Sequence, residues 1–459
     1  MITLANWQPH CRVGTRYLFL SMLVSRKISK ISKFLRTITR LPRWLILSLI
    51  TVLIIQLAIL PVLSQKTVTI RTLMRADEAA QWQPLVRKFE QQHPNIKLKV
   101  LEAPSDSDQV EALYTASFLL GNSPYDIVYM DIVWTPKFAA AGWLTDLSDR
   151  LSAAERADYL QGDIEGGIYE DKLYRIPFRS DAGMLYYRQD LLQQAGYEPP
   201  ETFDELLKIS QDLQAKGLAD WGYVWQGKQY EGLAAMFVEI LKGSGAFWVD
   251  PDTLEVGLDR PEAIEAVEFL RTAINNKISP PGVTTYAEEE TRRLFQNGKT
   301  VFLRNWPYVY SAALDSPIAG KYSIKPMVHQ PGEESGATLG GWGLGIAKSS
   351  KHKDEAWQVI EFFSSEASQR EYVLATGYVP SRTALFNDPE IVAKYNYYPQ
   401  LLEVVKSSAL RPPIAQYAQA SDILQRYLSS ALTQKMSPQR AMEAAANETR
   451  RLLKLQENN

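Results

Sequence analysis

The residues best suited to chemistry are aromatic side chains that stand beside carboxylates, amides or arginines at five places in the chain. These stretches are 130–134, 181–188, 221–231, 304–308 and 339–342. A sugar presents hydroxyl groups around its edge and C–H groups on its two faces. Carboxylates and arginines bind hydroxyls through charge-assisted hydrogen bonds, while tryptophan and tyrosine cover apolar faces. The combination favours binding of a polyhydroxylated small molecule.

Other chemistries lack the residues that they need. Cys11 is the only cysteine and the four histidines are far apart in sequence, so neither an intramolecular disulfide nor a cysteine-based metal cluster is available. The Gly298-Lys299-Thr300 string lacks the earlier glycine of a phosphate loop, because position 293 is arginine. The glycine-rich stretch 341–345 does not have dinucleotide-binding spacing, and no Gly-x-Ser-x-Gly string occurs. We therefore expect no cofactor and no metal.

Charge is distributed unevenly along the 459 residues. Residues 1–64 hold nine lysines and arginines and no acid, whereas residues 65–459 hold 41 basic and 52 acidic residues, a net charge of −11. Phosphate backbones are bound by clustered lysine and arginine. An acidic main body therefore argues against nucleic-acid binding.

The N-terminal segment predicts export. Residues 1–43 form a basic region, and 44–64 include a run of twenty uncharged residues from Trp44 to Leu63, long enough to cross a membrane. Basic residues before the run place the N-terminus in the cytoplasm and everything after about Gln65 outside. The run is either a cleaved signal peptide or an uncleaved inner-membrane anchor, and a buried core helix is the third reading.

Periodicity in the exported body predicts alternating strands and helices. A strand at 66–73, a helix through Trp82 and Phe89, and a strand from Ile96 form the strand–helix–strand unit of a parallel sheet, and a third strand ends at Asp131. Later helices are predicted after the capping box Thr202–Glu205 and over 261–274, 354–374 and 437–453. A short strand at 300–303 leads into Asn305-Trp306-Pro307. The fold class is therefore α/β.

Three strings, WGYVWQGKQYEGL at 221–233, RNWPY at 304–308 and ATLGGW at 337–342, resemble the extracytoplasmic solute-binding proteins of ABC sugar importers, in particular the trehalose/maltose-binding branch. The resemblance covers about 67–453. It implies a type II periplasmic-binding-protein fold with two hinged lobes, 65–178 plus 326–376 and 179–325 plus 377–459, that close on one sugar. It also implies a partner, a membrane permease with a cytoplasmic ATPase.

The same resemblance implies which residues hold the sugar. Carried over motif by motif, they are Glu78, Asp131, Asp181, Trp306, Tyr308, Trp342 and Arg411. Two departures matter, because members of this branch have an aromatic residue where Arg179 stands and tend to have a basic one after the string that ends at Gln109. Beside the trehalose or maltose that the branch implies, the ligand can thus be another glucoside, such as a glucosylated polyol, or sucrose.

Each of these residues also has a plainer structural reading. Asp131 could cap a helix that starts at Ile132, Asp181 could pair with Arg179 or Arg188, and the tryptophans could belong to the core. Flanking glycines are expected to leave Trp342 little packing of its own. At the level of function, the alternative is an exported glycoside hydrolase or transferase that uses two of the cleft carboxylates.

Overall fold

The computed structural model describes residues 48, 51, 67–406 and 408–454. Contacts divide the chain into 1–67 and a compact unit, 68–459, which carries almost all of the described residues. The predicted signal or anchor run at 44–64 therefore lies outside the described residues, apart from Ser48 and Thr51. Within the described part of the chain, no helix combines the length and apolar character needed to span a membrane.

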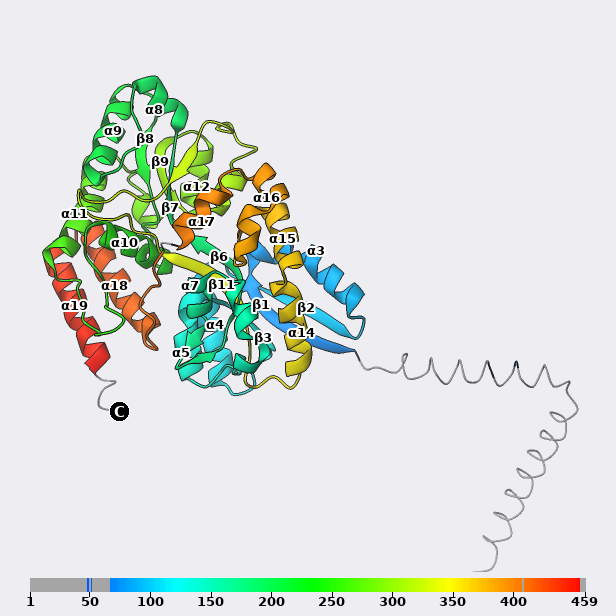
Figure 1. The fold of residues 1–459 in the computed structure, drawn as a ribbon. Coiled ribbons are helices and arrows are strands. Elements are labelled where there is room, and N and C mark those ends of the chain that lie inside the picture. Colours follow the sequence, from blue (N-terminus) through cyan, green and yellow to red (C-terminus); the bar gives the residue numbers. More distant parts are fainter. Residues whose placement is uncertain (1–47, 49–50, 52–66, 407, 455–459) are drawn as a thin grey trace, which may run out of the picture. The chain divides into compact units, whose positions relative to one another are not determined.

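One half of this unit is built around a six-stranded sheet (Figure 1). Its order is β12 (Val379–Pro380), β6 (Ile176–Ala182), β11 (Leu339–Ile346), β3 (Ile127–Asp131), β1 (Val68–Arg75) and β2 (Ile96–Ala103). Strand β1 runs parallel to β2 and β3, which confirms the predicted strand–helix–strand unit, and β11 runs antiparallel to β3 and β6. Helices of this half are α3 (Ala76–Gln92), α4 (Ser107–Leu119), α5 (Thr135–Ala140), α14 (Lys353–Ser364) and α15 (Glu366–Thr376).

A second, four-stranded sheet has the order β10 (Ser323–Lys325), β7 (Met184–Tyr187), β9 (Thr300–Asn305) and β8 (Trp221–Val224). Helices in this part of the chain are α8 (Gln189–Ala195), α9 (Phe203–Ala215), α10 (Glu231–Gly243), α11 (Pro261–Asn275), α12 (Glu288–Gln296) and α13 (Tyr308–Ala312). The predicted capping box starts α9, where the Thr202 and Glu205 side chains bond each other's backbone N–H groups.

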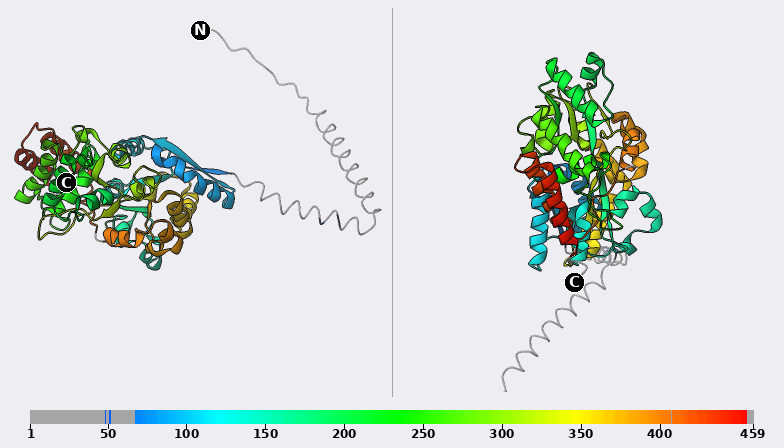
Figure 2. Two further views of the ribbon diagram at one scale, coloured as in Figure 1. Left: turned by 90° about the horizontal axis from the view of Figure 1, so that it is seen from above. Right: turned by 90° about the vertical axis from the view of Figure 1, so that its left-hand side faces the viewer.

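The C-terminal part of the chain is helical. It comprises α16 (Pro389–Lys394), α17 (Tyr398–Lys406), α18 (Tyr417–Leu432) and α19 (Pro438–Lys454). In Figure 2 these last helices, in red, lie beside green segments of the chain. Helix α18 contacts α10 and α11, and α19 contacts α11 and α18. The remaining elements are short: α6 (Ala153–Ala157), α7 (Gln161–Glu165), the pair β4 (Ile168–Tyr169) and β5 (Lys172–Leu173), and four 3-10 turns at Ile132–Trp134, Ser148–Arg150, Val283–Thr285 and Thr383–Asn387.

The single helix predicted over 354–374 is wrong. It is broken at Ser365, which ends α14 in an extended conformation and whose hydroxyl accepts the backbone N–H of Ser368 to start α15. Serine at a helix start satisfies an N–H that has no partner inside the helix. The two helices can therefore change direction at this residue.

The chain passes from one sheet to the other at Gly183, the one residue between β6 and β7. A side chain cannot fit there, because a Cβ would lie 1.7 Å from Oε1 of Glu239. Of the predicted lobe boundaries, 178/179 falls inside β6, and 376/377 falls just before β12, which pairs with β6. The division of the chain into lobes remains a prediction.

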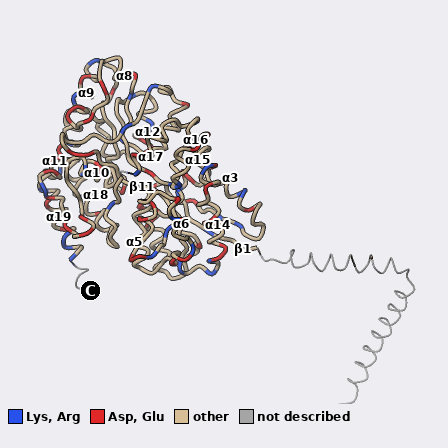
Figure 3. The backbone as a smooth tube through the Cα atoms, viewed as in Figure 1, with Lys and Arg blue, Asp and Glu red and all other residues tan. Residues whose placement is uncertain are grey.

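Basic and acidic residues are interspersed along the described chain (Figure 3). Arginines and lysines there repeatedly pair with carboxylates, as in Arg450–Asp259 and Arg370–Asp388. Recognition of a nucleic-acid backbone relies instead on unneutralised basic patches. The absence of nucleic-acid binding by the main body stays a prediction.

Candidate functional site

A cavity of about 390 Å³ lies between residues of the two sheets and their helices. Its walls come from β3, β6 and β11 on one side, and from α10, α12 and the turn after β9 on the other. All seven predicted site residues line it: Glu78, Asp131, Asp181, Trp306, Tyr308, Trp342 and Arg411. Residues that are up to 333 positions apart in sequence (Glu78 and Arg411) are thus brought to one site.

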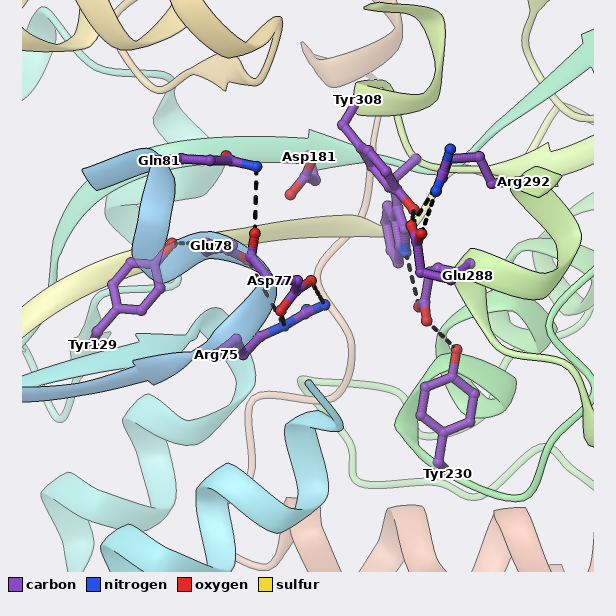
Figure 4. Close-up of polar contacts among 12 residues, drawn as sticks. Arg75, Asp77, Glu78, Gln81, Tyr129, Asp181, Tyr230, Glu288, Arg292 and Tyr308 are labelled. Carbon is purple, nitrogen blue, oxygen red and sulfur yellow. Dashed lines mark hydrogen bonds and ion pairs between the residues drawn. The ribbon is translucent and has the colours of Figure 1, made fainter. Parts of the chain in front are cut away.

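Arg179 organises the wall formed by the six-stranded sheet. Its guanidinium donates to Oε1 of Glu78 at 2.8 Å and to Oδ2 of Asp181, and it lies 4.5 Å from the ring centre of Tyr378. The Tyr129 hydroxyl donates to the other Glu78 oxygen at 2.7 Å (Figure 4). Glu78 is 0% exposed and both its oxygens have partners. Arg179, Arg75 and Tyr129 therefore hold Glu78 in the cavity wall.

The two carboxylates beside Arg179 are in different electrostatic states. Burial disfavours ionisation of Glu78, but Arg179, Arg75 and the Tyr129 hydroxyl outweigh it and lower its pKa below the ordinary value. Burial raises the pKa of Asp181 to about 6 against the attraction of Arg179, with Glu78 and Asp131 adding to the increase. Oδ1 of Asp181 is buried without a hydrogen-bond partner. This oxygen is an available acceptor for a ligand hydroxyl.

Asp131 ends β3 and is held in two ways. Its Oδ1 accepts the backbone N–H of Val133 at 3.3 Å, so the helix-cap reading is correct, and it also accepts Nη2 of Arg411 at 3.1 Å. Arg411 is 3% exposed and pairs with Glu231 at the start of α10 as well. One guanidinium thus ties a strand of the first sheet to a helix of the opposite wall.

Trp306 stands in the opposite wall and is partly exposed. The guanidinium of Arg304 lies 4.2 Å from the ring centre of Trp306. The indole Nε1 of Trp306 donates to Oε1 of Glu288 at 3.3 Å. The Tyr230 hydroxyl donates to the other Glu288 oxygen at 2.5 Å (Figure 4). A Cβ on Gly340 would touch both Asp181 and Trp306, at 3.1 and 3.2 Å, so the missing side chain allows the two walls to approach.

Tyr308 lies beyond Trp306 in the same wall. Its hydroxyl donates to Oε1 of Glu289 at 2.9 Å, and its ring stacks on Tyr378 with centres 5.8 Å apart. Burial raises the pKa of Tyr308 well above its ordinary value, and Glu289 and Glu288 raise it further. The hydroxyl therefore stays protonated and serves as a donor.

The expectation that Trp342 lacks packing is wrong. It is 4% exposed, stacks on Tyr129 with ring centres 4.9 Å apart, and meets Trp134 edge-on at 5.2 Å. Its register partner in β3 is Asp131. The neighbouring glycines thus let the flanking strands pack closely on the indole. Trp342 is therefore a core residue of which only a small part lines the cavity.

Sequence reasoning missed several cavity residues. Arg75, Tyr230, Glu231, Glu288, Glu289 and Tyr378 line the site beside the predicted set. Tyr230 and Glu231 belong to the 221–231 stretch but were not selected as site residues. The acidic run at 288–290 gave no clear signal of a binding site, because acidic residues are also favoured at the start of a helix. Among the described residues, no group of histidine, cysteine and acidic side chains could hold a metal ion.

Both the sequence and the structure of the chain are similar to those of known binding proteins. Residues 75–370 match the family described as bacterial extracellular solute-binding protein. A "Probable ABC transporter-binding protein" of Deinococcus radiodurans is 32% identical over 365 residues, which cover 77% of this chain and 86% of that protein. A mannitol-binding protein of Pseudomonas aeruginosa is 26% identical over 424 residues, covering 86% and 95%. The structure of maltose-bound MalE3 of T. maritima is 35% identical, with a TM-score of 0.80 over 84% of this chain and 100% of that chain.

Proposed function

Because the chain belongs to the family of bacterial extracellular solute-binding proteins, we propose that it captures a small sugar or polyol between two lobes and delivers it to an ABC importer. Its α/β fold is that of the two-lobed, MalE-like periplasmic binding proteins. The observation that carries the proposal is the shared cavity, which combines the partly exposed Trp306 with Asp181, whose Oδ1 has no partner.

The charge of the cavity favours a neutral ligand over an anionic one. Nine acidic residues line it, namely Asp77, Glu78, Asp106, Asp131, Asp181, Glu231, Glu288, Glu289 and Glu290, against the five basic residues Arg75, Arg179, Lys228, Arg293 and Arg411. A phosphate or carboxylate on the ligand would meet this excess of negative charge. Hydroxyl groups, which donate hydrogen bonds to carboxylates, suit it.

Within this class we propose a glucoside, namely trehalose, maltose, sucrose or a glucosylated polyol. Support comes from the trehalose/maltose-like strings in the sequence and from the maltose-bound relative at 35% identity. The mannitol-binding relative is the reason to include a polyol portion. Trp306 covers one face of a sugar ring, while Asp181, Tyr308 and the Arg179 cluster hold its hydroxyls.

The mechanism is closure of the lobes on the ligand. A sugar that touches both walls binds the closed form more tightly, so it shifts the population toward closure. The closed form is then the one that the permease subunits, which work with a cytoplasmic ATPase, recognise. The run at 44–63, outside the described residues, is proposed as the export signal or anchor of an extracytoplasmic protein.

Calorimetric titration with trehalose, maltose, sucrose, glucosylglycerol and mannitol tests the proposal. We expect at least one of these neutral ligands to bind, and its affinity to change less than about twofold between low and physiological salt, because a neutral ligand releases no counterions. Trehalose 6-phosphate is the matched anionic control and should bind far more weakly. Failure of every neutral ligand would contradict the proposal.

The hydrolase alternative has a direct test. A glycosidase needs two carboxyl groups on opposite sides of the scissile bond, one of them a proton donor. Here Glu78 and Asp131 are engaged by arginines, and so is one oxygen of Asp181. We expect no monosaccharide to appear when the protein is incubated with the disaccharide that it binds. Release at a rate that Asp181→Asn abolishes would favour the enzyme.

A further inference from the structure

Two helix starts meet across the rim of the cavity. Helix α4 packs on β1 and β3, whereas α10 is joined to β9 of the other sheet by the buried Arg304–Glu239 ion pair. Between them, Oδ2 of Asp108 accepts the backbone N–H of Glu231 at 3.2 Å, and Lys228 pairs with Asp106 at 2.9 Å. These four residues form what we call the rim contact.

Asp108 supplies a cap that α10 lacks on its own side of the cleft. The residue before α10, Tyr230, makes no side-chain cap, so the carboxylate comes from α4 instead. Asp106 meanwhile caps α4 itself by accepting the N–H groups of Asp108 and Gln109. A capping bond contributes to helix stability only while it is made. The start of α10 is therefore satisfied in full only when the two sides are together.

Acidic groups outnumber basic ones at this contact. The charged groups around Asp108 are Asp106 and Glu111 on its own helix, Glu231 and Lys228 at the start of α10, Lys137 of α5 bound to Glu111, and Arg411 shared by Glu231 and Asp131. No lysine or arginine of the described chain forms an ion pair with Asp108 itself. Burial, Glu231, Asp106 and Glu111 together raise its pKa to about 7.

We propose that the rim contact is a latch that stabilises the closed cleft through bonds between its two sides, and that it takes up a proton as it closes. The inference rests on the proposed function, since it regulates the same cleft. Asp108 and Lys228 are then positioning residues for closure. A proton on Asp108 removes the repulsion from Glu231 and leaves its other oxygen free to cap α10.

The sign of the pH effect follows from the change in surroundings. When the sides separate, Asp108 regains water and loses the repulsion of the Glu231 carboxylate, and both changes lower its pKa toward the ordinary value of about 4. Loss of the Glu231 N–H bond acts in the opposite direction but is the smaller effect. The closed form binds the proton more tightly, so closure is favoured at low pH, and this advantage is lost as pH rises toward 7. Because Asp106 and Glu111 stay beside Asp108 in both forms, we expect about a tenfold fall in the closed-to-open ratio from pH 5 to 7.5.

A sugar-free distance measurement tests the latch. Spin labels are attached to Arg87→Cys on α3 and Glu265→Cys on α11, both exposed sites, in the full-length chain carrying Cys11→Ser. We expect the short-distance population to decline from pH 5 to 7.5. Leaving sugar out removes the effect of ligand hydroxyls on Asp181, and the Asp108→Asn variant separates the titration of Asp108 from that of Asp181, whose pKa is about 6.

Variants assign the effect. Asp108→Asn keeps an acceptor for the Glu231 N–H but cannot titrate, so the pH dependence should flatten. Lys228→Gln should lower the closed population at both pH values. Lys216→Gln, which breaks an ion pair with Asp212 at the C-terminal end of α9, is the matched control and should change nothing.

Two results would overturn the latch: a wild-type distance distribution that does not respond to pH, or an Asp108→Asn protein that responds as the wild type does. Trehalose is then added as the probe. If trehalose and the other neutral sugars fail to bind while the sugar-free response is present, the proposed function is wrong and the latch stands. If a sugar binds but the sugar-free distances do not respond to pH, the latch is wrong and the proposed function stands.

Discussion

Arg411→Met is expected to lower the free energy of unfolding by about 3–5 kcal/mol, because it leaves two buried carboxylates without their cation. Those carboxylates, Asp131 and Glu231, come from different sides of the cavity. Sugar affinity should fall as well, since the substitution unties the two walls. Urea unfolding followed by circular dichroism measures the first effect, and calorimetry measures the second.

Arg370→Met is the matched control. Arg370 also pairs with two carboxylates, Asp388 and Glu390, but at the surface, where ion pairs contribute little. Its loss should leave unfolding and binding nearly unchanged. Equal effects of the two substitutions would show that burial of the Arg411 pairs carries no special weight.

Trp306→Ala should weaken sugar binding by about 30-fold while leaving the unfolding free energy close to that of the wild type. The estimate of about 2 kcal/mol is the loss typical of an aromatic residue that anchors a ligand face. Trp306 can be removed without opening a core, because it is partly exposed and stands on the cavity wall.

Trp342→Ala provides the contrast. The indole is 4% exposed and packed on Tyr129, so its loss should cost about 3–5 kcal/mol of stability, as for other buried tryptophans. If Trp306→Ala binds normally, or unfolds as readily as Trp342→Ala, then Trp306 is a structural residue and the proposed site is wrong.

Local patterns in the sequence predicted the elements well where neighbouring residues decide the outcome. The capping box at Thr202, the proline at the start of α11 and the acid that ends β3 all act within four residues of themselves. The gathering of the seven predicted site residues at one cavity was also foreseen, but through resemblance to a family rather than through physics.

What sequence could not reveal depends on contacts between distant residues. Arg179 and Glu78 are 101 positions apart, so nothing local indicates that the arginine takes up one of the carboxylate oxygens. Trp342 is buried by side chains from β3 and the turn after it. The break at Ser365 was missed because the apolar spacing was followed across it, although serine favours helix caps over helix interiors.

The setting of Trp306 gives the protein an optical signal of its own. Several other described tryptophans, such as Trp82 and Trp225, are fully enclosed and emit from surroundings that a ligand does not change. Trp306 is the partly exposed tryptophan that lines the cavity in the described chain, with the Glu288 carboxylate at its Nε1. A sugar laid on this indole replaces water, so its fluorescence should move to shorter wavelength, and occupancy can be read without any attached dye.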